Sequence, residues 1–349
     1  MNTSLEDLYN QINEIICSLD FEAIWKGFRP YKFALYNDAE CFFDGKYIEK
    51  TSDFCANTSI KFQGEIIAIW KVDVELEIPI FVSKIVHEMF HAFQDENGWS
   101  YCSANEMEAL YKYRYDEENL SVKLHENKLL LDLLDGYDGD KYRELLSCRR
   151  YRQEKFPYEF SYECSGEEIE GSANYIEWKV LKILDKVAAD KLIEDMRKDM
   201  IQPEYFFPIR ISGYYTGALL INAMIEAKDY YYGAANRPVI INKISSIDPI
   251  DKSASRTDDE YQKVSLAIKA FNDESKRIVE SAVKNGEVVL DGPYELVSVN
   301  IYDARCYEGY ITSRVFLMYT EKGEQKVING NFVIKMKDDK NIDKVFKWI

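Results

Sequence analysis

The sequence predicts an α+β protein in which a mostly helical region follows a small β-sheet and precedes an antiparallel β module. Apolar residues recur with helical spacing through much of residues 77–285, whereas β-rich runs separated by turn residues occupy residues 31–73 and the chain from residue 287 on. With 349 residues, of which 46% are hydrophobic, the chain can bury a sizeable core. We therefore expect three regions: 1–76, which belongs to the same domain as the helices, 77–285, and 286–349.

The N-terminal region combines one helix with the small sheet. Leucines and isoleucines at helical spacing predict a single amphipathic helix over residues 4–27. Three β-rich runs follow it, at residues 31–36, 59–62 and 64–70. These runs predict a sheet that comes just before the most informative helix of the chain.

That helix is predicted from Pro79 to the pair Asn97-Gly98. Proline suits the first turn of a helix, apolar residues recur at helical spacing after it, and Asn-Gly is a typical stop. The helix contains the pentapeptide His-Glu-Met-Phe-His at residues 87–91.

His87 and His91 are two of only three histidines in the chain, and a separation of four residues places them on one face of a helix. Their imidazole nitrogens could bind one tetrahedral metal ion, with Glu88 beside it as a general base for a bound water. This is the H-E-x-x-H pattern of zinc peptidases. The alternative is that two histidines fell four residues apart by chance on a buried helix face.

Catalytic zinc sites usually have three protein ligands and one open position, so a third ligand is needed. The third histidine, His125, lies in a polar, charged helical segment, where we expect a solvated surface residue. The metzincin pattern is absent, because Gln94 and Asn97 stand where it requires glycine and histidine. The better candidate is a carboxylate, Glu170, in the acidic helical segment of residues 167–178.

The His-Glu-x-x-His motif at residues 87–91, followed by Glu-Gly-x-Ala-x-Tyr-x-Glu at residues 170–177, resembles the gluzincin class of zinc metallopeptidases. In that class the third zinc ligand is a glutamate on a downstream helix, often followed by Gly and then Ala. The resemblance covers two helices and not the rest of the chain. It implies a zincin-like fold for the helical region.

The resemblance also implies a zinc-dependent peptidase that hydrolyses peptide bonds in a peptide or protein substrate. One Zn²⁺ per chain would be bound by His87, His91 and Glu170. Glu88 would take the proton of the attacking water and pass it to the leaving amine.

Gluzincins also use a tyrosine or histidine that donates a hydrogen bond to the developing oxyanion. A helix is predicted to start after Pro208, and it contains Tyr214, our candidate for this catalytic role. The neighbouring Tyr215 is the alternative, and Arg210 lies one turn earlier.

Three residues close to Glu170 are also expected to have roles at the site. Gly171 weakens a helix by roughly 0.5–1 kcal/mol relative to alanine, which a close approach to the metal helix or to the substrate would explain. Asn174 lies one turn further on, where it could accept the second ring N–H of a histidine ligand. Glu177 is a second candidate for the same surroundings.

Four other glutamates compete with Glu170 for the metal: Glu163, Glu167, Glu168 and Glu177. The first three could instead bind the amine of an aminopeptidase substrate. The alternative for the whole cluster is that these glutamates form an acidic helix face exposed to water. A short basic run at Arg149, Arg150 and Arg152 is expected to be a solvated helix end.

Residues 64–72 are our candidate for an edge strand that binds the substrate backbone by strand addition, with an ordinary core strand as the alternative. Polar helices over residues 103–154 and further helices over residues 167–230 are expected, the former as a layer over the cleft. Residues 235–258 predict a loop. Another helix, 259–284, precedes about four antiparallel strands, which could form an accessory binding module or a stabilising cap.

The formal net charge of −17 argues against nucleic acid and anionic membrane surfaces as partners. Seven cysteines without a C-x-x-C pair are typical of free thiols in a reducing compartment. The chain does not start with a basic segment and an apolar core, and no stretch reaches about 18 apolar residues. We therefore expect a cytoplasmic protein whose oligomeric state the sequence leaves open.

The rival hypothesis is a catalytically inactive zincin-like protein that acts as a binding module, with or without a metal. A third ligand with an open position predicts an enzyme, whereas a fourth protein ligand would close the site and predict a structural metal. No cysteine stands in a ligand pattern near the motif, which favours the open site.

Overall fold

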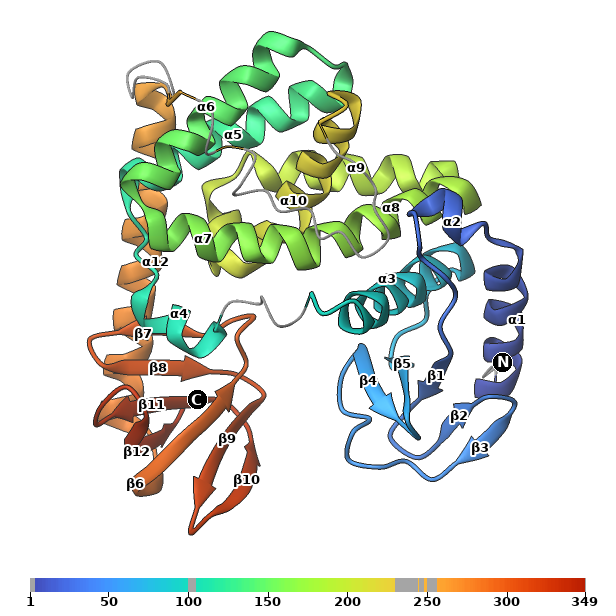
Figure 1. The fold of residues 1–349 in the computed structure, drawn as a ribbon. Coiled ribbons are helices and arrows are strands. Elements are labelled where there is room, and N and C mark those ends of the chain that lie inside the picture. The colour runs from blue at the N-terminus through green and yellow to red at the C-terminus, as the bar shows by residue number, and fades with distance from the viewer. Residues whose placement is uncertain (1–3, 100–104, 230–243, 245–247, 250–255, 349) are drawn as a thin grey trace.

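The computed structural model describes residues 4–99, 105–229, 244, 248–249 and 256–348 of the chain. The fold is α+β, as predicted: a small mixed sheet, a helical region and a C-terminal antiparallel sheet follow one another. In Figure 1 most of the helices form the upper part of the molecule, and the two sheets lie below its opposite ends.

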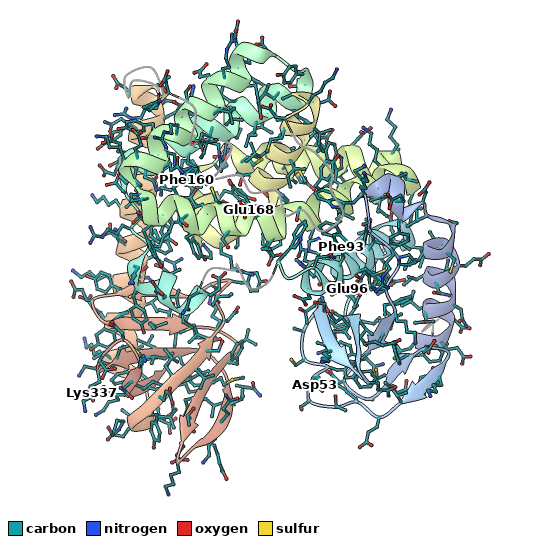
Figure 2. The ribbon with its side chains drawn as sticks, viewed as in Figure 1. Asp53, Phe93, Glu96, Phe160, Glu168 and Lys337 are labelled. Atoms are coloured by element: carbon teal, nitrogen blue, oxygen red, sulfur yellow. The ribbon has the colours of Figure 1, made fainter. Side chains whose placement is uncertain are left out.

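Figure 2 shows how labelled side chains lie in the helical region and on the C-terminal sheet. Phe160 and Glu168 both lie inside the helical region and are almost fully buried. Lys337, by contrast, is exposed on the C-terminal sheet. The helices therefore enclose a carboxyl group as well as apolar side chains.

The N-terminal segment forms two helices, α1 (Leu5–Ser18) and α2 (Phe21–Ile24), so the single helix predicted over residues 4–27 is wrong. Leu19 has an extended backbone conformation, and the Asp20 side chain accepts a hydrogen bond from the Ala23 backbone N–H. This cap starts the second helix. Because the apolar spacing continues across the break, it does not reveal the cap.

The small sheet has the strand order β3-β2-β1-β5-β4, with β1 and β5 parallel and the other pairs antiparallel. Its strands are β1 Phe33–Tyr36, β2 Cys41–Phe43, β3 Lys46–Ile48, β4 Thr58–Phe62 and β5 Glu65–Lys71. Helices α1 and α3 (Ile78–Glu96) pack on one face of this sheet. The metal-binding motif predicted from the sequence therefore lies on a helix that the sheet supports.

Residues 64–72, proposed as an edge strand beside the substrate, form the interior strand β5 instead. Its middle residues, from Ile67 to Ile69, are fully buried because both faces of the strand are covered. The outer strand is β4, joined to β5 by a tight turn in which Gln63 and Gly64 have φ values of 51° and 87°. The free edge on this side of the sheet belongs to β4.

Helix α3 confirms the helix predicted around the histidines. Pro79 lies in its first turn, Asn97 caps its C-terminus, and Gly98 follows with a φ of 75°. The helix lies between the small sheet and α8 (Ser172–Leu184), so its middle turns are buried on several sides.

The helices predicted over residues 103–154 and 167–230 are confirmed in the part of the chain that the structure describes. They are α4 Glu106–Lys112, α5 Glu117–Asp135, α6 Gly139–Lys155, α7 Pro157–Gly166, the π-helical turn η2 Glu167–Gly171, α8, α9 Lys186–Met200, the 3₁₀ turn η3 Pro203–Phe206 and α10 Ile209–Glu226. The loop predicted over residues 235–258 lies mostly outside the described residues. The next predicted helix is α12, Asp258–Asn285.

Glycines let α10 pack closely on η2. A Cβ added to Gly171 would lie 2.4 Å from the Gly217 Cα, and one added to Gly217 would lie 2.5 Å from the Glu167 carbonyl oxygen. A close approach at Gly171 therefore exists, but its partner is α10 rather than the metal helix or the substrate.

The C-terminal sheet has seven antiparallel strands in the order β10-β9-β6-β12-β11-β8-β7, so the predicted meander of about four strands is wrong. The strands are β6 Val288–Val299, β7 Arg305–Tyr307, β8 Tyr310–Ser313, β9 Phe316–Glu321, β10 Glu324–Asn329, β11 Phe332–Met336 and β12 Asn341–Lys347. The last strand, β12, inserts between β6 and β11. A local strand pattern does not reveal this pairing between the two ends of the module.

The C-terminal sheet is attached to the helical region by side-chain packing. Ile278, Val279 and Ala282, near the end of α12, pack on Val333 and Phe346 of the sheet. Helix α4 also packs against its core. The packing thus crosses the boundary that we placed between α12 and the C-terminal module.

The glycine contact gives a test of the packing between η2 and α10. Gly171→Ala should lower the free energy of unfolding by about 1–3 kcal/mol, because the new methyl group must push the two elements apart. Gly166→Ala is the matched control, since a Cβ there meets nothing within 4 Å. Chemical denaturation followed by circular dichroism measures both variants, and equal stability of the two would contradict the close contact.

Candidate metal centre

Three side chains with metal-binding atoms converge from two parts of the chain. His87 and His91 come from α3, and Glu170 comes from the π-helical turn η2. One nitrogen or oxygen from each lies within 4.8 Å of the others. His91 Nε2 is 3.1 Å from His87 Nε2 and 3.3 Å from Glu170 Oε2. The residues predicted as metal ligands are therefore together, and they could hold a metal ion.

Gln94 fixes the turn that carries Glu170 against α3. Its side-chain amide donates to the Ile169 carbonyl oxygen at 2.8 Å and to Ser172 Oγ at 2.9 Å, on either side of Glu170. Its Oε1 lies 2.7 Å from His91 Nδ1 and can only accept, so this ring nitrogen is the donor. His91 Nε2 is thereby directed toward Glu170. From the sequence, Gln94 served only to exclude the metzincin pattern, and its role beside His91 was not predicted.

Glu177 holds the other histidine. Its Oε2 lies 3.0 Å from His87 Nδ1, and its Oε1 lies 3.1 Å from Lys84 Nζ. Glu177, the second candidate from the sequence, thus faces this ring nitrogen, whereas Asn174 is buried in the wall of the cleft. A carboxylate at this distance orients the His87 ring.

Burial and nearby charges shift the pKa values of His91 and Glu170 in opposite directions. Burial alone would lower the pKa of His91, but the charge of Glu170 and its hydrogen bond raise that pKa to about 9. Burial alone would raise the pKa of Glu170, but His91 and Arg210 lower it to about 2. The Glu170 carboxylate is therefore anionic at neutral pH, as a metal ligand must be.

Glu88 lies beside the two histidines in the wall of the cleft, and only 8% of the residue is exposed. Burial raises the pKa of its carboxyl group, and the opposing effect of His87 and His91 is smaller. A carboxylate with a raised pKa is a better proton acceptor, which suits a general base.

His87, His91 and Glu170 line a cleft of about 820 Å³. Helices α3, α8 and α10 contribute most of its polar wall, and Thr58 brings in the start of the edge strand β4. Tyr302, from the loop between β6 and β7, also lines the cleft. Tyr302 was not predicted from the sequence, because no local motif links the C-terminal module to the histidines.

Both tyrosines considered as oxyanion donors line the cleft, but their rings face different groups. The Tyr214 ring lies nearly parallel to that of His87, at 11° and 6.5 Å between centroids. Its hydroxyl is 3.3 Å from the Tyr302 hydroxyl. Tyr215 stacks instead on Tyr205, with centroids 5.5 Å apart. This geometry favours Tyr214 as the tyrosine that faces the metal centre.

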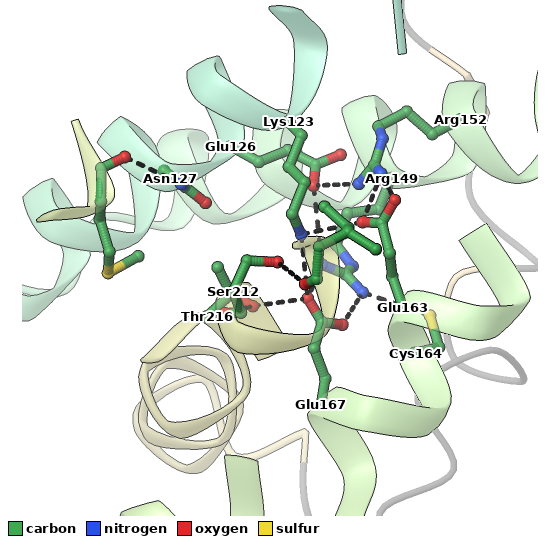
Figure 3. Close-up of polar contacts among 12 residues, drawn as sticks. Lys123, Glu126, Asn127, Arg149, Arg152, Glu163, Cys164, Glu167, Ser212 and Thr216 are labelled. Atoms are coloured by element: carbon green, nitrogen blue, oxygen red, sulfur yellow. Dashed lines mark hydrogen bonds and ion pairs between the residues drawn. The ribbon is translucent and has the colours of Figure 1, made fainter. Parts of the chain in front are cut away.

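A second group of buried charges adjoins the turn that carries Glu170 (Figure 3). Its cations and carboxylates are Lys123, Arg149 and Arg152, and Glu126, Glu163 and Glu167. We call these six residues the buried charge network. They come from α5, α6, α7 and η2, so their ion pairs join four successive elements. The three positive and three negative charges balance, which is the condition for burying them.

The network corrects two expectations from the sequence. Arg149 and Arg152 are 1% and 0% exposed, so the predicted solvated helix end is wrong for both. Lys123 Nζ lies 2.8 Å from Glu163 Oε2, and Arg149 Nη1 lies 3.2 Å from Glu167 Oε1. These two carboxylates are thus already paired and buried. They neither form an exposed acidic face nor line the cleft where a substrate amine would bind.

His125 and Glu168 also differ from the simplest expectation. His125 is only partly exposed, and its Nε2 lies 2.9 Å from Glu144 Oε1. It belongs to a shielded ion pair and is not among the clustered metal-binding groups of the described residues. Glu168 is almost fully buried and does not line the cleft.

Comparison of the chain with protein-family models, with curated proteins and with solved structures found no match. Among the helices that the structure describes, none combines the length and the apolar character needed to cross a lipid bilayer. The proposed function therefore rests on the geometry of the site.

The pKa of His91 gives a test of metal binding. At pH 7 this ring is protonated in the metal-free protein, because its pKa is about 9. A Zn²⁺ ion that binds Nε2 must displace this proton, so the apparent zinc affinity should rise about tenfold per pH unit between pH 6 and pH 8. Calorimetry in buffers of different ionisation enthalpy should detect the release of about one proton per ion. Binding without proton release would exclude His91 as a ligand.

The buried charge network gives a test of stability. Glu167→Gln should lower the free energy of unfolding by about 3–5 kcal/mol, because it leaves Arg149 buried without its carboxylate. Glu274→Gln is the matched control, since it breaks a pair with Arg277 whose side chains are 41% and 70% exposed, and it should change stability little. Urea denaturation of both variants would show the difference; similar midpoints would mean that water reaches the network.

Proposed function

We propose that the protein is a zinc-dependent peptidase that hydrolyses peptide bonds in peptide or protein substrates. The observation that carries the proposal is the convergence of His87, His91 and Glu170 beside Glu88 in the wall of an open cleft. Two imidazole nitrogens and one carboxylate oxygen are a ligand set of catalytic zinc, which keeps a further position open for water or substrate. One Zn²⁺ per chain fits this donor set.

When bound, the ion polarises the scissile carbonyl and makes a water molecule acidic at neutral pH. Glu88 accepts the proton of the attacking water and passes it to the leaving amine. The raised pKa of its carboxyl group supports both transfers, because the group must accept a proton and then release it.

Neighbouring groups orient the reacting parts. Glu177 and Gln94 fix the two histidine rings, which directs one nitrogen of each toward Glu170. Tyr214 faces the ligands from α10 and donates a hydrogen bond to the developing oxyanion. The free edge of β4 binds the substrate backbone by strand addition, the role first assigned to β5.

The wider chemistry of the chain supports a peptide substrate in a reducing compartment. The net charge of −17 disfavours nucleic acid and anionic membranes as partners. The described cysteines are free thiols: Cys17, Cys41, Cys55, Cys148, Cys164 and Cys306. Unpaired thiols are usual in the cytoplasm, which we propose as the location.

The test is Glu88→Gln in the zinc-loaded protein, assayed against a peptide library. The substitution should lower kcat by about 100- to 10,000-fold, because no carboxylate remains to take the proton, while the zinc content stays at that of the wild type. Glu96→Gln is the matched control. Glu96 lies on the same helix but pairs with Arg29 at the surface, so the variant should keep the activity of the wild type. Wild-type turnover by Glu88→Gln would refute the mechanism.

A further inference from the structure

Arg210 lies where three parts of the molecule meet. Its Nη2 donates to Glu170 Oε1 at 2.8 Å, while the other oxygen of that carboxylate faces His91. Its Nη1 pairs with Glu106 on α4. Its guanidinium carbon lies 5.3 Å from the ring centroid of Tyr302 in the C-terminal module. One side chain thus contacts a proposed metal ligand, a second carboxylate and an aromatic ring of the C-terminal module.

We propose that Arg210 is a positioning residue for the metal ligand Glu170, and that the C-terminal module holds Arg210 in place through Tyr302. The inference rests on the metal site of the proposed function and not on peptide hydrolysis. It gives the C-terminal module a role in the metal centre.

The geometry explains why arginine is needed at this position. Glu106 and Glu170 come from separate helical segments, and their side chains are only 26% and 13% exposed. A planar guanidinium can donate to two carboxylates at once in fixed directions, whereas an ammonium group is a point charge on a flexible stem. The Arg210 side chain is only 16% exposed, so these charge-assisted bonds are shielded from water. They hold Glu170 Oε1, which leaves Oε2 directed at the histidines.

Tyr302 brings the C-terminal module into contact with Arg210. Among the described residues that line the cleft, it is the one contributed by the C-terminal module. Its ring lies over Arg210, and its hydroxyl is 3.3 Å from that of Tyr214. It therefore contacts the residue that holds the metal ligand and also the proposed oxyanion donor.

The test measures zinc affinity by competition with a chelator, together with the visible spectrum of the cobalt-substituted protein, which reports ligand geometry. Arg210→Gln should weaken zinc binding by about 10- to 100-fold, as expected for the loss of a group that orients a metal ligand. Coulomb's law alone predicts tighter zinc binding by this variant, because the substitution removes a positive charge next to a cation. Arg210→Lys, which keeps the charge but loses the planar fork, should also weaken binding.

The role of the C-terminal module is tested by Tyr302→Ala, which should weaken zinc binding by about 2- to 5-fold. In the Arg210→Gln background, Tyr302→Ala should have no further effect, because the ring acts through Arg210. Tyr47→Ala is the matched control: Tyr47 is 47% exposed and Tyr302 is 48% exposed, but Tyr47 packs on Phe42 in the small sheet. It should leave zinc affinity unchanged.

Several outcomes would overturn the proposal. Unchanged or tighter zinc binding by Arg210→Gln would mean that Arg210 acts only as a nearby charge. Additive effects of Arg210→Gln and Tyr302→Ala would remove the link through Tyr302. Failure of the wild type to bind either metal would overturn both this inference and the metal site.

The readouts also separate this inference from the proposed function. A wild type that binds zinc without hydrolysing peptides, together with weakened binding by Arg210→Gln, would refute the peptidase alone. Peptide hydrolysis with unchanged zinc binding by Arg210→Gln and Arg210→Lys would refute the positioning role alone.

Discussion

The structure depends on the pairing of a row of buried carboxylates along α7, η2 and α8. Each of these carboxylates contacts a different set of cationic or histidine partners: Glu163 with Arg152 and Lys123, Glu167 with Arg149, Glu170 with His91 and Arg210, and Glu177 with His87 and Lys84. A buried carboxylate without such a partner would cost several kcal/mol, so the pairs determine how the surrounding helices can pack. The contacts of Glu163 and Glu167 join helices to one another, and those of Glu170 and Glu177 orient the two histidines of the proposed metal centre. Stability and chemistry therefore share one helical stretch.

The part of the site on α3 could be predicted because it follows from local geometry alone. A separation of four residues places His87 and His91 on one helix face in any fold that keeps the helix. The choice of Asn174 over Glu177 could not be made from spacing, because positions four and seven residues after Glu170 both lie on its face of a helix. The packing of α8 on α3 decides that Glu177 lies beside His87.

The buried charge network could not be predicted, because its partners come from separate helices. Taken by themselves, Arg149 and Arg152 resemble any basic helix end, and their burial depends on carboxylates in α7 and η2. The fold class was predictable from the patterns of strands and helices, whereas the order of strands in the C-terminal sheet was not. That order depends on β12, which pairs with the distant strand β6. Local sequence thus predicts elements better than their partners.

Tyr302 links the C-terminal module to Arg210 and Tyr214 in the cleft. Tyr214 and Tyr302 are 88 residues apart, yet their hydroxyls lie within 3.3 Å. The packing of α12 and α4 on the C-terminal sheet fixes the position of the module that carries Tyr302. A displacement of that module would move the ring away from Arg210, which pairs with Glu170. The geometry of the proposed metal centre would then depend on packing at a sheet that contributes none of its proposed ligands.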